Sequence, residues 1–257
     1  ADRKELGLPY GQDAVISALA HVNRNLVVVN ISGNAVAMPW VKEVPSIVQA
    51  WFLGTEAGNA IASVLMGDVN PSGKLPFTFP VSLADVGAHK LGEYPGTPRN
   101  DGSNIVDEKY NESIFVGYRW TDKEKITPLF PFGHGLSYTS YKYGKAVIDK
   151  NIMGDDEVLT VTVPITNIGM RAGSEIVQMY ISDLKSSLPR PVKELKGFSK
   201  VSLEPGETKK VTFTINKEAL SFFDDVRHEW IAEPGIFKAI IAASATDIRS
   251  SVIFEYK

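Results

Sequence analysis

The sequence has 257 residues, a formal net charge of −3 and no cysteine, and these properties exclude several classes of protein. The slight excess of acidic residues leaves no basic surplus for the phosphates of a nucleic acid. The absence of cysteine rules out disulfides, thiolate nucleophiles and cysteine-ligated metals. No apolar run approaches the length of about 18 residues that a membrane-spanning helix needs. We therefore expect no nucleic-acid partner and no membrane span.

Residues 1–80 alternate between helical and strand patterns, which indicates an α/β domain with a mostly parallel sheet. Residues 13–22 place apolar side chains on one helical face, and residues 46–52 have a short strand pattern. Residues 26–31 (LVVVNI) are a nearly continuous β-branched run, which is typical of a parallel strand buried on both faces.

The segment 54–80 has the pattern of a helix followed by a turn and a strand. Thr55 is predicted to cap the helix, Glu56 to lie in its first turn, and Gly67 to end it in the left-handed conformation. Neither glycine-rich nucleotide fingerprint is present, so a nucleotide-binding protein is the most weakly supported interpretation.

Residues 81–139 are irregular and rich in proline, glycine and asparagine. Within them, the alternation of residues 110–120 (YNESIFVGYRW) predicts a strand. The aromatic run 128–143 is expected to be a connector that packs on other structure, because its aromatic side chains would not stay solvated. The basic run 186–197 is predicted to be a solvated loop.

From about residue 140 the apolar residues recur with a period of two, which predicts strands. Short strands separated by turn residues indicate a β-sandwich of the immunoglobulin or fibronectin type III kind. The expected strands are 158–165, 175–181, 210–216, 235–243 and 251–256. The sequence thus predicts an α/β part over 1–80, a connector over 81–139 and an all-β sandwich over 140–257.

Several single polar residues could do chemistry, but a structural role is favoured for each. Glu56 suits a helix start, and Glu112 suits a structural hydrogen bond on a strand. Asp68 and Lys74 flank a turn and are expected to pair or to face water. His134 has no second histidine near it, so a packed or surface histidine is favoured over a metal ligand or a base.

The histidines and tryptophans lead to the same structural interpretation. The four histidines, His21, His89, His134 and His228, have no metal-ligand spacing, so we expect no metal and no cofactor. Trp40, Trp51 and Trp120 are expected to pack in a core or an interface in preference to stacking on a sugar. The sequons at Asn30 and Asn111 lie in strand-like segments and are expected to stay unmodified.

Six blocks, in one order and nearly from end to end, carry a family resemblance. They are DRKELGLP (2–9), AWFLGTEAGNAIASVLMGDVNPSGKLPFTFP (50–80), YPG (94–96), YNESIFVGYRW (110–120), PLFPFGHGLSYTSY (128–141) and RPVKELKGF (190–198). Together they resemble glycoside hydrolase family 3, and specifically the C-terminal portion of its three-domain β-glucosidases.

The resemblance implies a barrel, an α/β sandwich and a fibronectin type III-like domain, and hydrolysis of β-D-glucosides, in some members of xylosides, with retention. Retention requires two carboxyl groups about 5–5.5 Å apart. In the family the nucleophilic aspartate comes from the barrel, and the acid/base glutamate usually lies shortly before the segment that DRKELGLP resembles. We therefore expect no catalytic residue in this chain and both acids upstream of Ala1, with Asp2 and Arg3 as supports of the glutamate's loop.

The resemblance also implies partners, namely an N-terminal (β/α)8 barrel part and a β-linked oligosaccharide or aryl glucoside substrate. Without that part the strand at 26–31 would have an unpaired edge, and we expect the chain alone to be inactive. The alternative is a non-catalytic carbohydrate-binding or interaction module. A homodimer is compatible with the sequence, and a periplasmic or secreted location is favoured over a cytoplasmic one.

Overall fold

The computed structural model describes residues 5–257, which form two compact units. Unit 1 comprises the described residues up to 69 together with 78–117 and 126–130. Unit 2 comprises residues 70–77, 118–125 and 131–257. None of the helices in this described part of the chain is both long enough and apolar enough to span a bilayer.

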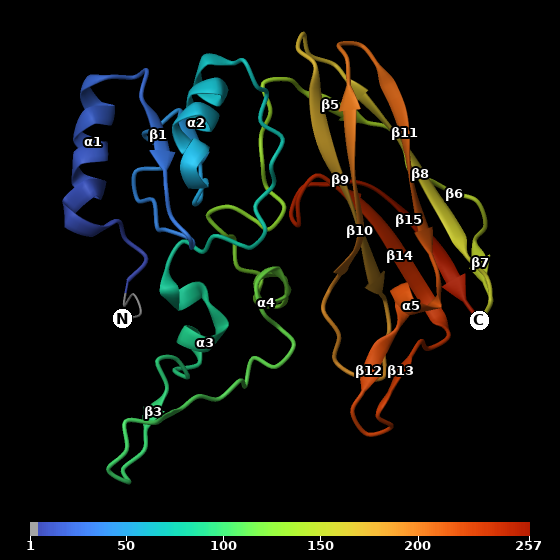
Figure 1. Ribbon diagram of the computed structural model, residues 1–257. Helices are drawn as coiled ribbons and strands as arrows, with labels where there is room; N and C mark the ends of the chain where they lie inside the picture. Colours follow the sequence, from blue (N-terminus) through green and yellow to red (C-terminus); the bar gives the residue numbers. More distant parts are fainter. Residues whose placement is uncertain (1–4) are drawn as a thin grey trace. The chain divides into compact units, whose positions relative to one another are not determined.

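Unit 1 contains a small parallel sheet (Figure 1). Strand β1 (Val27–Asn30) pairs in parallel with β2 (Ser46–Gln49). Helix α1 (Gln12–Val22) precedes β1, and the 3-10 turn η1 (Pro9–Gly11) precedes α1. The predicted helix and the parallel pairing are confirmed.

The burial expected for β1 is wrong. Val27 is 45% exposed, Val28 and Val29 are only partly covered, and Asn30 alone in the strand is buried; Ile31, just after the strand, is 58% exposed. Within the described residues β1 pairs with β2 and with no other strand. Val15 and Val22 on α1 are also mostly exposed. Unit 1 therefore presents apolar side chains on both its helix and its strand.

Helix α2 (Ala57–Met66) follows the 3-10 turn η2 (Gly54–Glu56). It ends at Gly67, which has φ 80° and the left-handed conformation, so the predicted end is confirmed. The start differs from the prediction, because Glu56 and not Thr55 occupies the N-cap position, and no side chain there accepts a capping hydrogen bond.

The remaining elements of unit 1 are short. They are η3 (Leu83–Asp85), α3 (Gly87–Lys90), β3 (Thr97–Pro98) and β4 (Val106–Asp107). Phe79 and Phe130 form an isolated antiparallel bridge with their rings edge to face, so the aromatic connector does pack on other structure.

The strand predicted over 110–120 is wrong. Ser113 (φ 55°) and Gly117 (φ 59°) both have positive φ, which an extended strand does not allow. The chain turns there and then enters helix α4 (Tyr118–Glu124), which belongs to unit 2. The alternation of apolar residues came from a turn and a helix start.

Unit 2 is a β-sandwich, as predicted (Figure 1). One sheet has the order β10-β9-β14-β15-β7, and the other has the order β11-β8-β5, with β6 also paired to β8. Their bounds are β5 (Tyr141–Tyr143), β6 (Val147–Ile148), β7 (Ile152–Met153), β8 (Leu159–Asn167), β9 (Gly173–Asp183), β10 (Glu194–Leu203), β11 (Thr208–Ile215), β14 (Gly235–Ala242) and β15 (Ile248–Tyr256). The helix α5 (Lys217–Leu220) and the hairpin of β12 (Phe222–Asp224) and β13 (Glu229–Ile231) lie between β11 and β14 in sequence.

The two sheets enclose one hydrophobic core. Strand β8 buries every second residue along its whole length, and β11 and β14 contribute inward residues to the same cluster. Phe237 and Phe254 stack at 5.8 Å between ring centres. Each fully buried aliphatic or aromatic side chain stabilises the fold by roughly 1.5–3 kcal/mol relative to an exposed one. The alternation of apolar and polar residues thus predicted the strands of unit 2 correctly.

The loop predicted over 186–197 is confirmed up to residue 193, but the solvation expected for its basic side chains is wrong. The side chain of Arg190 is only 7% exposed and contacts Asp183 at 3.2 Å and Glu194 at 3.1 Å. Lys193 is also buried and pairs with Asp122. The basic residues of this run are therefore neutralised inside unit 2, and its last residues belong to β10.

Candidate functional site

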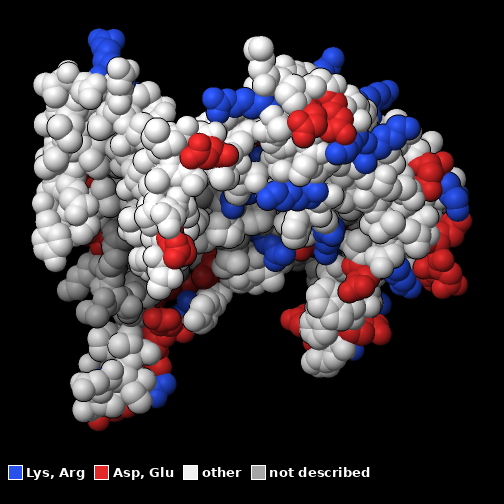
Figure 2. Space-filling view, turned by 45° about the horizontal axis from the view of Figure 1, so that its top comes forward, with Lys and Arg blue, Asp and Glu red and all other residues white. Residues whose placement is uncertain are grey.

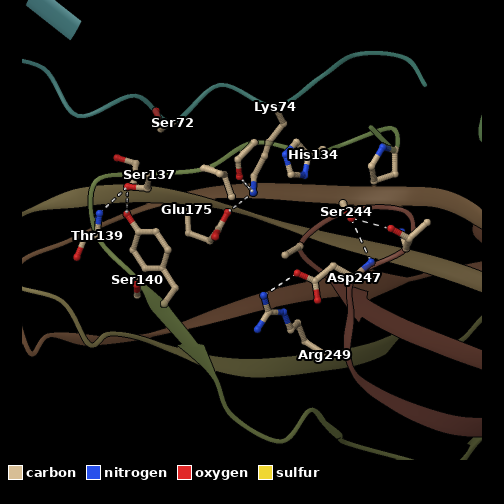
Figure 3. Close-up of a pocket in the computed structure, with 17 residues that line it drawn as sticks. Ser72, Lys74, His134, Ser137, Thr139, Ser140, Glu175, Ser244, Asp247 and Arg249 are labelled. Carbon is tan, nitrogen blue, oxygen red and sulfur yellow. Dashed lines mark hydrogen bonds and ion pairs between the residues drawn. The ribbon is translucent and has the colours of Figure 1, made fainter. Parts of the chain in front are cut away.

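A cavity of about 530 Å³ lies within unit 2 (Figure 3). It is lined by the segment around Lys74, by 131–141, by the start of β9 and by the loop between β14 and β15. Its lining residues are Ser72, Lys74, Pro131, His134, Gly135, Leu136, Ser137, Thr139, Ser140, Tyr141, Ser174, Glu175, Ala243, Ser244, Thr246, Asp247 and Arg249. Small-molecule sites have volumes of about 300–1,000 Å³, so the cavity is large enough for a ligand.

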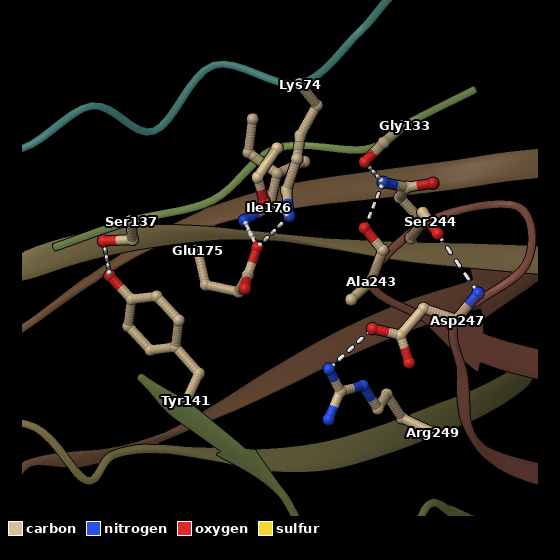
Figure 4. Close-up of polar contacts among 12 residues, drawn as sticks. Lys74, Gly133, Ser137, Tyr141, Glu175, Ile176, Ala243, Ser244, Asp247 and Arg249 are labelled. Atoms are coloured by element: carbon tan, nitrogen blue, oxygen red, sulfur yellow. Dashed lines mark hydrogen bonds and ion pairs between the residues drawn. The ribbon is translucent and has the colours of Figure 1, made fainter. Parts of the chain in front are cut away.

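Lys74 and Glu175 form an ion pair in the cavity wall (Figure 4). Lys74 Nζ lies 2.9 Å from Glu175 Oε1, and the two side chains are 12% and 9% exposed. Lys74 also donates to the Gly135 carbonyl at 3.1 Å, and Glu175 Oε1 also accepts the Ile176 backbone N–H at 2.7 Å. Each charge thus has a second partner, which an ion pair removed from water requires. The expectation that Lys74 would pair or face water is confirmed.

His134 lies beside this ion pair and is partly buried. Burial lowers the pKa of its imidazole below the usual value, and the nearby Lys74 ammonium lowers it further, against a smaller opposing effect of Asp247. The ring is therefore neutral near pH 7, with one nitrogen as donor and the other as acceptor.

A second ion pair joins the loop between β14 and β15 to the start of β15. Arg249 Nη2 donates to Asp247 Oδ2 at 2.6 Å, and the guanidinium lies 5.2 Å from the ring centre of Tyr143. Ser244 Oγ accepts the Asp247 backbone N–H at 3.1 Å, which holds the loop in place. Burial raises the pKa of Tyr143, with a further contribution from Glu175, so its phenol stays protonated. Its hydroxyl has no hydrogen-bond partner among the described residues.

Asn70 positions the segment that carries Ser137, one of the residues that line the cavity. Its Oδ1 accepts from Ser137 Oγ at 2.9 Å and from the Tyr138 backbone N–H at 2.7 Å, and its Nδ2 donates to the Ala172 carbonyl at 2.9 Å. The phenol of Tyr141 lies 3.5 Å from Ser137 Oγ. One asparagine therefore ties the 137–138 segment to the residues that precede β9.

Unit 1 contains a separate group of buried acids. Glu93 accepts hydrogen bonds from both the backbone and the side-chain amide of Asn111. Glu112 is only 6% exposed, and its Oε2 has no partner in the described part of the chain. Glu112 lies in a turn and not on a strand, which corrects the position predicted for it.

The other predicted acids do not join either group. Glu56 and Asp68 are exposed, and Glu56 Oε2 accepts from Asn59 Nδ2 at 2.6 Å. Asp2 and Arg3 lie outside the described residues. Within residues 5–257, no group of three or more His, Asp or Glu side chains is arranged to hold a metal ion.

The three tryptophans that were predicted to pack do so. Trp40 is fully buried and donates to Asp13 Oδ1 at 2.7 Å, and Trp120 is 5% exposed. Trp51 is partly buried with its ring 6.1 Å from that of Phe79, edge to face.

Comparisons with known proteins identify both parts of the chain. The glycosyl hydrolase family 3 C-terminal domain matches residues 1–138, which is more than half of the chain, and a fibronectin type III-like domain matches residues 175–245. The chain belongs to glycoside hydrolase family 3.

Its relatives in the family are much longer proteins. A β-glucosidase from Bacteroides ovatus, BoGH3A, is 55% identical over 257 residues, a match that covers 99% of this chain and 34% of that protein. Thermostable β-glucosidase B from Acetivibrio thermocellus is 45% identical over 247 residues, covering 96% of this chain and 32% of that protein. The chain thus spans about a third of the length of these relatives.

Solved structures agree with this assignment. The crystal structure of a Kluyveromyces marxianus β-glucosidase in complex with glucose superposes with a TM-score of 0.88 at 40% identity, covering 100% of this chain and 30% of that one. DesR, a β-glucosidase from Streptomyces venezuelae in complex with D-glucose, superposes with a TM-score of 0.90 at 38% identity, covering 99% and 32%. These superpositions include both the α/β part and the fibronectin type III-like sandwich of the chain.

Sequence reasoning missed three charged residues of the cavity, namely Glu175, Asp247 and Arg249. One signal was available for the first of them. Glu175, Val177 and Met179 are alternate residues of β9, so their side chains lie on the same face of the strand. Because Val177 and Met179 are buried in the core, the carboxylate of Glu175 is expected on the inward face as well. Asp247 and Arg249 follow a turn, where no periodicity distinguishes them.

Proposed function

We propose that this chain is the C-terminal part of a retaining β-glycosidase that hydrolyses terminal β-D-glucosides, and that it supports the active site without carrying either catalytic acid. The observation that carries the proposal is the 55% identity to a β-glucosidase over the whole chain, which covers only 34% of that enzyme. Family members bound to glucose support a β-glucoside as the substrate. Both catalytic acids would then come from the part of the enzyme that precedes Ala1.

Unit 1 supports the proposed partner, an N-terminal barrel part of the same enzyme. Strand β1 pairs with β2 on one edge, and its other edge has no partner among the described residues. The free N–H and C=O groups of such an edge can pair with another strand. Apolar side chains exposed on unit 1 include Val15, Val22, Val27, Ile31, Phe52 and Met66. Figure 2 shows few charged side chains over the helices of unit 1, although acidic and basic side chains gather at its β3–β4 hairpin, and Lys and Arg alternate with Asp and Glu over unit 2. Exposed apolar surface of this kind marks an interaction site.

The same proposal assigns a role to each segment of the chain. Residues 1–80 would complete the α/β domain, 81–139 would connect it and pack on the barrel part, and 140–257 would form the fibronectin type III-like domain. Asp2 and Arg3 would support the loop that carries the acid/base glutamate.

Reconstitution tests the proposal. The purified 257-residue chain should not hydrolyse an aryl β-glucoside, and co-expression with the N-terminal part of the enzyme should restore turnover. Val28→Asp on β1 should abolish association, because a carboxylate would replace an apolar side chain beside the open edge. Thr214→Asp on the exposed face of β11 is the matched control and should leave association unchanged. Turnover by the chain alone, or no turnover with the N-terminal part present, contradicts the proposal.

The second candidate function is a carbohydrate-binding module within the same chain. The polar cavity of unit 2 is the observation that favours it. The two functions are compatible, because the first concerns unit 1 and a partner and the second concerns unit 2 alone.

A further inference from the structure

We propose that the cavity of unit 2 is a binding site for a small neutral saccharide. It is built from Lys74, His134, Glu175, Asp247 and Arg249, with hydroxyl groups between them (Figure 3). The proposal goes beyond support of catalysis and does not depend on it, because every lining residue belongs to unit 2.

The charges of the cavity select an uncharged ligand. Two cations, Lys74 and Arg249, are each matched by a carboxylate, at 2.9 Å and 2.6 Å. An anionic ligand would meet the carboxylates of Glu175 and Asp247, and a cationic ligand would meet the ammonium and the guanidinium. A neutral ligand avoids both repulsions and leaves the two ion pairs intact. The imidazole of His134 adds no charge near pH 7, because its pKa is lowered.

The hydrogen-bonding groups that remain suit a polyol. Ser72, Ser140 and Thr246 line the cavity and contribute three hydroxyl groups to it. Glu175 uses Oε1 for both of its hydrogen bonds, so Oε2 remains as an acceptor. Hydroxyls both donate and accept, carboxylates accept, and the guanidinium donates. A sugar, in which every hydroxyl does both, can use all of these groups at once.

The walls of the cavity are held in place by their own hydrogen bonds. Gln178 Nε2 donates to the Gly133 carbonyl at 3.1 Å and to the Ala243 carbonyl at 3.0 Å, which ties the 133–137 segment to the loop between β14 and β15 (Figure 4). A Cβ atom at Gly135 would collide with the Gly73 carbonyl. Tyr141 adds an aromatic ring on which an apolar sugar face can rest. A preformed site of this kind loses little entropy when it binds a ligand.

Three probes with the same sugar ring and different charge test the ligand class. The 257-residue chain is titrated by calorimetry and by saturation-transfer NMR with methyl β-D-glucopyranoside, D-glucuronate and D-glucosamine. We expect the neutral glucoside to bind in the millimolar range, at least as tightly as either charged sugar. Failure of the folded chain to bind it, or a charged sugar that binds more than tenfold tighter, would overturn the proposal.

Variants test the location. Thr246→Val and Asp247→Asn should each weaken binding at least fivefold, because each removes a polar group from the cavity. Thr214→Val changes an exposed threonine of β11 outside the cavity and should leave the affinity unchanged. Ser140→Ala replaces Asp247→Asn if circular dichroism shows that the latter is misfolded. Equal affinities for the cavity variants and the control would exclude this site.

The same titration on the co-expressed two-part enzyme separates this proposal from the proposed function. Only the part of the signal that Thr246→Val removes reports on the cavity, whereas turnover reports on reconstitution. If turnover is lost but binding in the cavity is unchanged, only the proposed β-glycosidase function is refuted. If turnover is restored but no variant changes binding, only the proposed saccharide site is refuted.

Discussion

Lys74 Nζ lies 2.9 Å from Glu175 Oε1 in a nearly buried ion pair, although a long stretch of chain separates the two residues in sequence. The pair joins the loop that carries Lys74 to the start of strand β9, which carries Glu175. Lys74 also donates to the Gly135 carbonyl. It therefore connects three segments of unit 2, and its contribution to stability can be measured.

Lys74→Met should lower the free energy of unfolding by about 3 kcal/mol, because it leaves the carboxylate of Glu175 buried without its cation. Urea unfolding of the chain checks this value. The double variant Lys74→Met/Glu175→Gln should regain part of the loss, since no buried charge would remain. Lys150→Met is the control, because Lys150 and Glu157 form an exposed ion pair that should contribute little to stability. Equal effects of Lys74→Met and Lys150→Met would contradict the prediction.

His134 should make the stability of unit 2 depend on pH below 6.5. Its pKa in the folded state is lowered by burial, so between that value and 6.5 the unfolded chain binds the proton more strongly. The stabilisation from neutral His134 is fully present above the unfolded pKa and is lost as pH falls toward the folded pKa. The free energy of unfolding should therefore decrease as pH falls through that window.

His134→Gln should remove this part of the pH dependence relative to the unsubstituted chain. Thermal unfolding at several pH values between 5 and 8 measures the difference. A profile for His134→Gln that matches the unsubstituted chain would show that the imidazole does not control it.

Gly133→Ala should be much more destabilising than Gly206→Ala. Both glycines have φ 78°, so an alanine has the same backbone strain, of about 1–2 kcal/mol, at either site. At Gly133 a Cβ atom would also collide with the side-chain amide of Gln178, whereas at Gly206 no atom lies within 4 Å. Melting temperatures of the two variants test this, and similar losses would mean that the Gln178 side chain moves away at little cost.

Arg190→Met should lower the free energy of unfolding by about 3–5 kcal/mol, because Asp183 and Glu194 would keep their buried charges without a cation. Arg190 also donates to the Leu220 carbonyl at 2.9 Å, so a backbone acceptor loses its partner too. Lys217→Met is the control, since Lys217 and Asp155 are about half exposed and should contribute little. Chemical denaturation of both variants decides whether Arg190 is a structural residue or the loop residue that its sequence context suggests.

The elements that could be predicted are those with a local signal. The strand over 158–165 is confirmed as β8 because alternate apolar residues must face one core, and Gly67 ends α2 because only a residue that tolerates positive φ can do so. Residues 110–120 have the same alternation, but Ser113 and Gly117 turn the backbone there. Periodicity describes side-chain order and does not reveal a positive φ.

By itself, the amino-acid sequence determined the family, the α/β and sandwich parts and the parallel pairing of β1, because these follow from order, period and turn residues along the chain. Only the tertiary structure decided that Lys74 meets Glu175, that Asp247 lies in the same cavity as His134, and that Arg190 is buried. Such pairs depend on which loops close over which strand ends. That closure is set by the packing of the whole unit, and no local pattern of residues encodes it.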